Sequence, residues 1–170
     1  AIRWLLGAIR RVLGLDMQGK TRNSWESTSL GSIASLRKVA SPVPAPAADE
    51  VVVGVRAIGL NFADLFCCLG LYEAANAVLK ERADAGEAGA FCPGLEFSGE
   101  VLALGSAVTQ SLDGQPLRVG DRVFGFTRFG AYRSVVVTRA IFVRPIPKGW
   151  SFAEATSLLA QGLTAWHGLV

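Results

Sequence analysis

The sequence lacks any long hydrophobic run that is free of charge. A membrane-spanning helix needs about 20 apolar residues in succession, and no part of the 170-residue chain approaches that length. A transmembrane protein is therefore not expected. Cysteine is scarce too, because Cys67, Cys68 and Cys92 are odd in number and share no repeated spacing. That pattern excludes a disulfide framework and favours a reducing compartment, so we expect a cytoplasmic protein.

Phosphate-binding signatures are missing as well. No Gly-x-Gly-x-x-Gly follows a stretch that has the pattern of a strand, and the sequence contains no P-loop. Such loops bind the phosphates of a nucleotide through backbone N–H groups at the start of a helix. The chain is therefore not expected to hold a dinucleotide by itself.

A strong charge of either sign is absent from most of the chain. The net charge is +3; residues 1–50 contain seven Lys or Arg against four Asp or Glu, and residues 51–170 contain ten of each. The whole excess of positive charge thus lies in the first 50 residues. Binding of nucleic acid needs a basic surface that neutralises phosphates, so no nucleic-acid partner is expected.

What the chain does have is apolar sequence. Hydrophobic residues make up 51% of it and charged residues 18%, which suffices for one packed core and excludes a disordered chain. The length fits a single domain with an attached arm.

Residues 1–16 are expected to be that arm. Within residues 1–15, six apolar residues recur at helical spacing, with Arg3, Arg10 and Arg11 outside the stripe, which predicts a basic amphipathic helix. Two interpretations stay open. In the first, the helix makes a weak contact with a membrane or derives from an organelle-targeting segment, and the latter origin would make the localisation organellar. In the second, the helix packs against the rest of the fold.

The body of the chain has the pattern of many short strands with few helices. Residues 17–34 are polar and Gly/Ser-rich, and the alternating Pro42, Pro44 and Pro46 further on are interpreted as an extended connector, with a polyproline-type recognition peptide as the alternative. Beyond them, turn residues separate short β-branched runs. The strands are expected at 50–58, 94–104, 120–126, 131–138 and 141–144, and two helices at 61–69 and 73–85. The predicted fold class is mainly β with a few helices (α+β), a small, partly open β-barrel over residues 17–150.

The last 20 residues are expected to be helical. Ser151 and Glu154 have the spacing of a capping box, which begins a helix that continues through Leu159. A second helical stretch covers residues 161–170. We treat residues 151–170 as a segment that follows the barrel.

Four segments, in this order, resemble a known family. They are Gly59-Leu-Asn-Phe-Ala-Asp64 with Gly70-Leu-Tyr72 close behind, Pro93-Gly-Leu-Glu-Phe-Ser-Gly99, Gly120-Asp-Arg-Val123 and Gln161-Gly-Leu-Thr164. Together they resemble the N-terminal, GroES-like catalytic domain of the medium-chain dehydrogenase/reductase superfamily. The branch that they resemble is the zinc-independent quinone oxidoreductases (zeta-crystallin-like).

The resemblance implies that a nucleotide-binding Rossmann domain follows residues 151–170, so this chain is expected to be part of a longer enzyme and inactive alone. It also implies NADPH as the cofactor, bound mainly by that second domain, and a small quinone or α,β-unsaturated carbonyl as the substrate of hydride transfer. A homodimer is expected for the full-length protein. Because vesicle amine transport proteins are relatives in this family, a non-catalytic, membrane-associated adaptor with the same fold is the alternative.

Zinc is not expected. Catalytic zinc in this superfamily has three protein ligands, and at the matching positions this sequence has Asn61, Leu95 and Gln161. An amide and an aliphatic side chain supply neither thiolate nor imidazole. A structural zinc site needs four closely spaced cysteines, which the sequence does not contain, and the three cysteines are interpreted as small apolar packing residues.

The resemblance assigns two residues to the reaction. Asn61 resembles the family's amide on the nicotinamide side of the cleft, and its alternative role is to begin a helix. Tyr72 resembles a tyrosine beside the reacting carbonyl, where its phenol donates a hydrogen bond or a proton. The alternative for Tyr72 is a tyrosine that packs on the barrel with its hydroxyl group in water.

Further contacts with the cofactor are assigned to Phe62, Asp64, Thr164 and His167, of which the last two share a helix face. His167 is alternatively an ordinary core histidine. Asp64 and Glu96 are interpreted as buried structural acids. A last group is interpreted as solvated strand charges: Arg122, Arg128 and Arg133.

Overall fold

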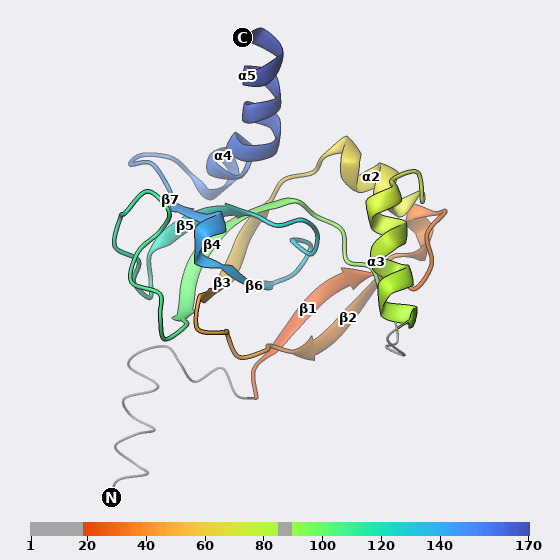
Figure 1. The fold of residues 1–170 in the computed structure, drawn as a ribbon, viewed down its shortest axis with the longest axis horizontal. Coiled ribbons are helices and arrows are strands. Elements are labelled where there is room, and N and C mark those ends of the chain that lie inside the picture. The colour runs from red at the N-terminus through yellow and green to blue at the C-terminus, as the bar shows by residue number, and fades with distance from the viewer. Residues whose placement is uncertain (1–18, 85–89) are drawn as a thin grey trace, which may run out of the picture.

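A computed structural model describes residues 19–84 and 90–170 of the chain (Figure 1). The predicted amphipathic arm, residues 1–16, lies outside the described residues. The strands are β1 (Thr21–Glu26), β2 (Arg37–Pro42), β3 (Glu50–Ile58), β4 (Glu96–Leu104), β5 (Arg122–Phe126), β6 (Val135–Arg139) and β7 (Val143–Pro145). Five of them form an antiparallel sheet in the order β6-β3-β4-β5-β7, and β1 and β2 pair separately.

The main core lies on one face of the five-stranded sheet. Val51 and Val53 are completely buried there and pack with Phe97, Val101 and Val123 from β4 and β5. Val52 points to the opposite face and joins a smaller core. The run of β-branched residues in β3 is thus buried on both faces, as the central position of that strand requires.

The predicted fold class is confirmed. The chain is mainly strand with a few short helices, and the order β6-β3-β4-β5-β7 ends in two unpaired edges, so the barrel is partly open. The strands expected near 50–58, 94–104, 120–126, 131–138 and 141–144 are β3 to β7, with shifts at their ends of up to four residues.

The helices follow the sequence predictions closely. They are α2 (Phe62–Cys68), α3 (Glu73–Asp84), α4 (Phe152–Thr156), the π-helix η3 (Leu158–Gly162) and α5 (Leu163–Leu169), with short 3₁₀ turns at Ile33–Ser35 and Ala140–Phe142. Ser151 and Glu154 form the predicted capping box, in which the Glu154 backbone N–H donates to Ser151 Oγ at 3.2 Å. The π-helix, which joins α4 to α5, was not predicted.

The sequence analysis predicted neither β1 nor β2, and the extended segment expected at Pro42, Pro44 and Pro46 begins only at the last residue of β2. Only Ser24 is buried in β1 and no residue is buried in β2, so neither strand shows the alternation of apolar and polar residues by which strands are recognised. Contacts with distant segments hold them instead. Trp25 N–H donates to Tyr132 O at 3.0 Å, and Ser27 exchanges two backbone hydrogen bonds with Phe91.

No single helix among the described residues is long and apolar enough to cross a membrane. One bent pair, α2 with residues Glu73–Glu81, meets that test by length and composition alone.

Candidate functional site

The candidate site is built around the first turn of α2. Asn61 is the N-cap of this helix and forms a capping box with Asp64. The Asp64 carboxylate accepts the backbone N–H of Asn61 at 2.9 Å. This satisfies an N–H group that the helix itself leaves without a partner. The capping role considered for Asn61 is therefore confirmed, and it holds the residue in a defined position.

Asp64 is almost completely buried and has two further donors from distant parts of the chain. Gly94 N–H donates to Oδ1 and the Tyr132 hydroxyl donates to Oδ2, each at 3.2 Å. Burial raises the pKa of the Asp64 carboxyl, and the hydrogen bonds from Asn61, Tyr132 and Gly94 lower it only in part. Asp64 thus ties the start of α2 to the loop before β4 and to the segment before β6.

Glu96, the first residue of β4, is completely buried. Its Oε1 accepts a hydrogen bond from Asn61 Nδ2 at 2.9 Å, and its Oε2 accepts one from the Ala160 backbone N–H at 2.8 Å. Asn61 therefore donates to two buried acids, its main chain to Asp64 and its side chain to Glu96. The expectation that both acids are buried and bond to nearby backbone is confirmed.

The hydrogen bond to Ala160 extends the network into the C-terminal helices. Ala160 lies in η3, and its carbonyl accepts a hydrogen bond from the Thr164 hydroxyl at 2.5 Å. Asn61, Glu96 and Thr164 are therefore connected through one residue of η3. Among the predicted site residues, the structure brings together Asn61, Asp64 and Thr164 in this way.

The other predicted site residues lie outside that network. Phe62 is 78% exposed. Tyr72 lies beyond the other end of α2, is 46% exposed, and its side chain makes no hydrogen bond within residues 19–84 and 90–170. His167 is exposed on α5, so its alternative role as a core histidine is wrong for this chain.

The three positions that match zinc ligands differ in their surroundings. The Asn61 side chain donates a hydrogen bond to Glu96, Leu95 is half-buried, and Gln161 is exposed. The part of the chain that the structure describes contains no group of three or more His, Cys, Asp or Glu that could hold a metal ion.

Two residues of the site were not singled out in the sequence, Tyr132 and Gly94. Tyr132 is 68 residues from Asp64, and no local pattern links the two. Gly94 has a φ of +104°, and a Cβ there would lie 2.7 Å from the Tyr132 backbone nitrogen. Its position in the Pro-Gly-Leu-Glu segment was the only signal in the sequence.

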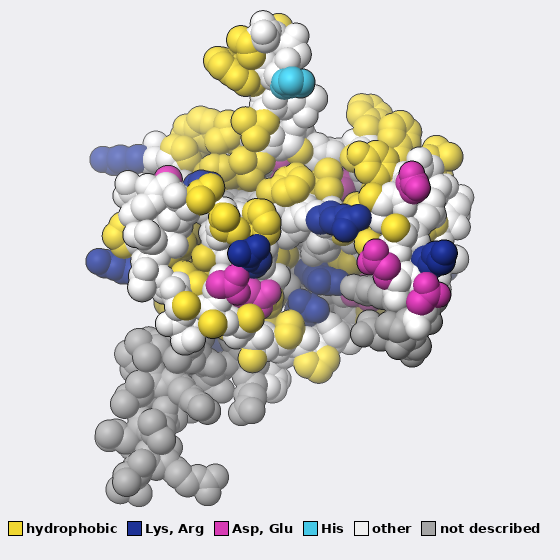
Figure 2. Space-filling view, in the orientation of Figure 1, with side chains coloured by type: hydrophobic (Ala, Val, Ile, Leu, Met, Phe, Trp, Pro, Cys, Tyr) yellow, Lys and Arg dark blue, Asp and Glu magenta, His cyan; other side chains and the backbone are white. Residues whose placement is uncertain are grey.

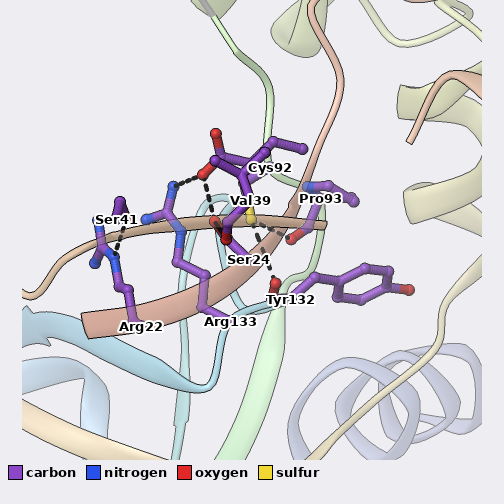
Figure 3. Close-up of polar contacts among 9 residues, drawn as sticks. Arg22, Ser24, Val39, Ser41, Cys92, Pro93, Tyr132 and Arg133 are labelled. Atoms are coloured by element: carbon purple, nitrogen blue, oxygen red, sulfur yellow. Dashed lines mark hydrogen bonds and ion pairs between the residues drawn. The ribbon is translucent and has the colours of Figure 1, made fainter. Parts of the chain in front are cut away.

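The interpretation of Arg133 as a solvated charge is wrong. Its guanidinium group lies 3.7 Å from the Glu26 carboxylate, with only 20% of the side chain exposed, and it faces the inner side of β1 beside Ser24 and Cys92 (Figure 3). The pairing of β1 with the segment before β6 covers the Arg133 side chain.

Arg122 and Arg128 are exposed, as expected, and each lies over an aromatic ring.

All three cysteines are free and buried, as the sequence analysis proposed. Burial raises the pKa of the Cys67 and Cys92 thiols to about 11 each, and the Asp64 carboxylate adds to the rise at Cys67. A protonated, buried thiol is a poor nucleophile and a poor metal ligand. The cysteines are therefore packing residues.

Hydrophobic side chains remain exposed at the end of the molecule where α2 and α5 lie. Figure 2 shows them gathered over both helices. Each is at least 38% exposed: Leu60, Phe62, Leu65, Phe66, Leu69, Leu71 and Tyr72 around α2, and Leu163, Trp166, Leu169 and Val170 in and after α5. So many exposed apolar residues at one end of the molecule are typical of a surface that another body covers.

The sequence matches the family model of the alcohol dehydrogenase GroES-like domain over residues 47–148. It is 38% identical over 122 residues to a phenolphthiocerol synthesis type I polyketide synthase of Mycobacterium bovis, which covers 72% of this chain and 5% of that protein. It is 36% identical over 123 residues to the synaptic vesicle membrane protein VAT-1 homolog of Danio rerio, which covers 72% of this chain and 22% of that protein.

Solved structures agree with the sequence comparison. The fold matches the CurK enoyl reductase with a TM-score of 0.69 and 29% identity, over 86% of this chain and 42% of that one. It matches the Escherichia coli quinone oxidoreductase complexed with NADPH with a TM-score of 0.67 and 30% identity, over 88% of this chain and 40% of that one. The chain thus spans less than half of each of these relatives.

Proposed function

The chain belongs to the alcohol dehydrogenase GroES-like domain family, as the resemblance predicted, and we propose that it is the catalytic domain of a zinc-independent oxidoreductase. In this proposal the full-length enzyme transfers a hydride from NADPH to a quinone or to an α,β-unsaturated carbonyl compound. The observation that carries the proposal is Asn61, which stands where a zinc-binding relative has a cysteine and is held by the two buried acids Asp64 and Glu96.

A nucleotide-binding domain would complete the protein. Similar structures extend well beyond the matched region, since the matches cover 40% to 44% of those chains. We propose that residues 17–150 are the GroES-like domain and that residues 151–170 lead into the second domain. That domain would cover the exposed apolar residues of α2 and α5, and it would bind the phosphates of NADPH, for which this sequence has no loop.

This chain would supply the contacts on the nicotinamide side. Asn61 is half-buried, and the hydrogen bond from its amide nitrogen to Glu96 fixes the orientation of the amide. Its oxygen has two lone pairs, so it would accept a hydrogen bond from the cofactor in addition to the one of the capping box. Thr164, on the helix that follows η3, is the second candidate contact, and Phe62, Asp64 and His167 are the remaining candidates. NADPH would supply the hydride, and no zinc would be needed, because an amide or aliphatic group at the three ligand positions cannot bind it.

Without a metal, the negative charge that forms on the substrate oxygen needs a directed donor. Tyr72 is the candidate, since its side chain is exposed and makes no hydrogen bond within the described residues. In the full-length protein, Tyr72→Phe is expected to lower kcat by about 10²-fold if the bond is fully made in the transition state, with little change in cofactor affinity. A change below about threefold in kcat would show that Tyr72 only packs.

The direct test of the activity is oxidation of NADPH by the full-length protein with a panel of quinones and enones. Turnover with either class, in protein that elemental analysis shows to be free of zinc, is the expected result. Failure of every acceptor in a protein that binds NADPH would overturn the proposal. We expect the enzyme to work in the cytoplasm as a homodimer, which sizing of the same preparation would check.

The second candidate is a membrane-associated adaptor without catalytic activity. It is favoured by the similarity to synaptic vesicle membrane protein VAT-1 homologs and by the exposed apolar residues around α2. An adaptor would sediment with phospholipid vesicles and would lack NADPH oxidation, whereas the enzyme would show the opposite behaviour in both assays.

A further inference from the structure

Glu96 is a completely buried carboxylate with two partners that lie on different parts of the fold. Asn61 Nδ2 donates to Oε1 at 2.9 Å from the start of α2, and the Ala160 N–H donates to Oε2 at 2.8 Å from η3. Both oxygens accept, which is the pattern of an ionised carboxylate. Hydrogen bonds to a buried charge are stronger than those between neutral groups.

The bond to Ala160 explains why the helix widens at this point. A group that takes a backbone N–H from a helix competes with the hydrogen bond of that turn and distorts it. In η3, Gly162 N–H donates to Ser157 O at 3.1 Å, five residues back, instead of four. The π-turn thus coincides with the residue whose N–H is bound by Glu96, and it sets where α5 and Thr164 begin.

The fold leaves the Glu96 side chain little freedom. Gly59 packs against it so closely that a Cβ at residue 59 would lie 2.1 Å from Oε1, and the Gly59 N–H donates to the Glu96 main-chain oxygen at 3.2 Å. The carboxylate therefore stays between Asn61 and Ala160.

We propose that Glu96 is a positioning residue that holds the Asn61 amide and the η3–α5 turn in one fixed arrangement. The bond from one of its two N–H groups to Glu96 fixes the orientation of the Asn61 amide, so that its oxygen and its NH₂ group do not exchange places. The significance of this arrangement for catalysis rests on the proposed function, in which Asn61 and α5 contact the cofactor. The hydrogen bonds themselves are independent of that proposal.

The requirement for a carboxylate follows from the direction of the hydrogen bonds. The Ala160 N–H belongs to the backbone and cannot reverse, so in Glu96→Gln the glutamine must turn its oxygen toward Ala160. Its NH₂ group then faces the Asn61 NH₂ group, and two donors meet. Asn61 then has two choices. It rotates its amide by 180°, which turns the oxygen away from its capping position, or it keeps its orientation and a buried N–H donor loses its hydrogen-bond acceptor.

The same reasoning predicts a compensating pair. In Asn61→Asp alone, a second carboxylate faces Oε1 of Glu96, which is repulsive in a buried site. In the double variant Glu96→Gln with Asn61→Asp, the glutamine oxygen accepts from Ala160 and its NH₂ group donates to Asp at position 61. Every hydrogen bond is then restored, and the negative charge lies at position 61 instead of position 96.

The test is a double-mutant cycle on the 170-residue chain, with urea unfolding as the measurement. Each single variant is expected to lower the equilibrium constant for folding by about tenfold or more, the usual result of leaving a buried polar group unsatisfied. The double variant is expected to recover at least about tenfold relative to the product of the two single losses. Losses that simply multiply would overturn the proposal. If Asn61→Asp alone does not fold, recovery of folding in the double variant is the supporting result, and its failure to fold contradicts the proposal.

The matched control is Ser98→Ala. Ser98 is also completely buried on β4, two residues from Glu96, and it bonds the Phe152 carbonyl and the Thr156 hydroxyl on α4. Its loss weakens the packing of β4 on the same helical segment without touching Asn61. The Ser98→Ala and Asn61→Asp losses should multiply, so a recovery in that pair as well would show that the coupling is not specific to Glu96.

A second measurement connects the arrangement with the cofactor. In the full-length protein, Glu96→Gln is expected to raise the KM for NADPH at least about fivefold, and the double variant should recover most of that loss, because an Asp at position 61 is again held in one orientation and keeps an acceptor oxygen. If the two substitutions are coupled in urea unfolding but the KM for NADPH is unchanged, the positioning role of Glu96 is supported. That result would contradict the contact between Asn61 and the cofactor in the proposed function.

Discussion

The sheet and the helical end of this molecule bury their residues in different ways. In β3 and β4, Val51, Val53, Val101 and Phe97 are buried almost completely in one apolar core. At the end formed by α2 and α5, apolar residues such as Phe62 and Leu169 are 78% and 85% exposed, while the carboxylates of Asp64 and Glu96 are buried. The sheet is stabilised by apolar packing, whereas the helical end buries two hydrogen-bonded carboxylates and exposes many apolar side chains.

In the proposed function, the sheet is the scaffold and the helical end carries the site. Buried acids contribute less to stability than apolar residues of similar size, because they lose their hydration. Their hydrogen bonds fix the direction of the groups that they hold, here Asn61 and the η3–α5 turn. The exposed apolar residues around them are what a second domain would cover.

The largest expected effect compares the same substitution in the two regions. Phe97→Ala removes a completely buried ring from the core and is expected to lower the free energy of unfolding by about 3–5 kcal/mol. Phe62→Ala removes an exposed ring and should change it by about 0.5 kcal/mol or less. Urea titration of both variants measures the contrast. Similar losses would mean that the α2 end is packed as the sheet is.

A smaller effect is expected from glycine substitutions in the helical end. A Cβ at Gly59 would overlap Glu96, so Gly59→Ala should cost about 1–3 kcal/mol of unfolding free energy. Gly168, in α5, has open space around its Cα, and Gly168→Ala should be neutral or stabilising by up to about 1 kcal/mol because alanine favours the helix. Thermal unfolding of the pair checks this, and a neutral Gly59→Ala would show that Glu96 is free to move.

The smallest effect concerns the pH dependence of stability. Burial raises the pKa of the Cys92 thiol from its ordinary value to about 11, so between about pH 9 and pH 11 the unfolded chain loses this proton while the folded chain keeps it. The free energy of unfolding should therefore fall as the pH rises through that window, by about 2 kcal/mol at most.

Cys92→Ala provides the control for that pH effect. It should reduce the decline between pH 9 and pH 11 by about half when urea midpoints are compared across the range, because the Cys67 thiol contributes in the same window. An unaltered decline would assign the effect to Cys67, whose pKa is also raised to about 11.

The sequence predicted best those features that depend on neighbouring residues. The valine run of β3 and the Ser151–Glu154 capping box act within a few residues, and both are where the pattern indicates. The polar strand β1 was missed because only Ser24 in it is buried, and the burial of Arg133 depends on that strand.

The site itself depends on residues far apart in the chain. Glu96 bonds Asn61 across 35 residues and Ala160 across 64, and Asp64 bonds Tyr132 across 68. The motifs named Asn61, Asp64 and Glu96 as important residues but not their connection. That connection forms only when the chain packs. The same holds for the π-turn η3, in which the Ala160 N–H is bound by the Glu96 carboxylate from β4.

The most direct test of the account is hydrogen exchange of the full-length protein with and without NADPH. If the helical end contacts the cofactor, the cofactor should slow exchange of backbone amides in residues 61–66 and 160–167 and leave β1 and β2 unchanged. Slower exchange confined to regions other than α2, η3 and α5, in a protein that binds NADPH, would contradict the assignment of this end of the molecule to the active site.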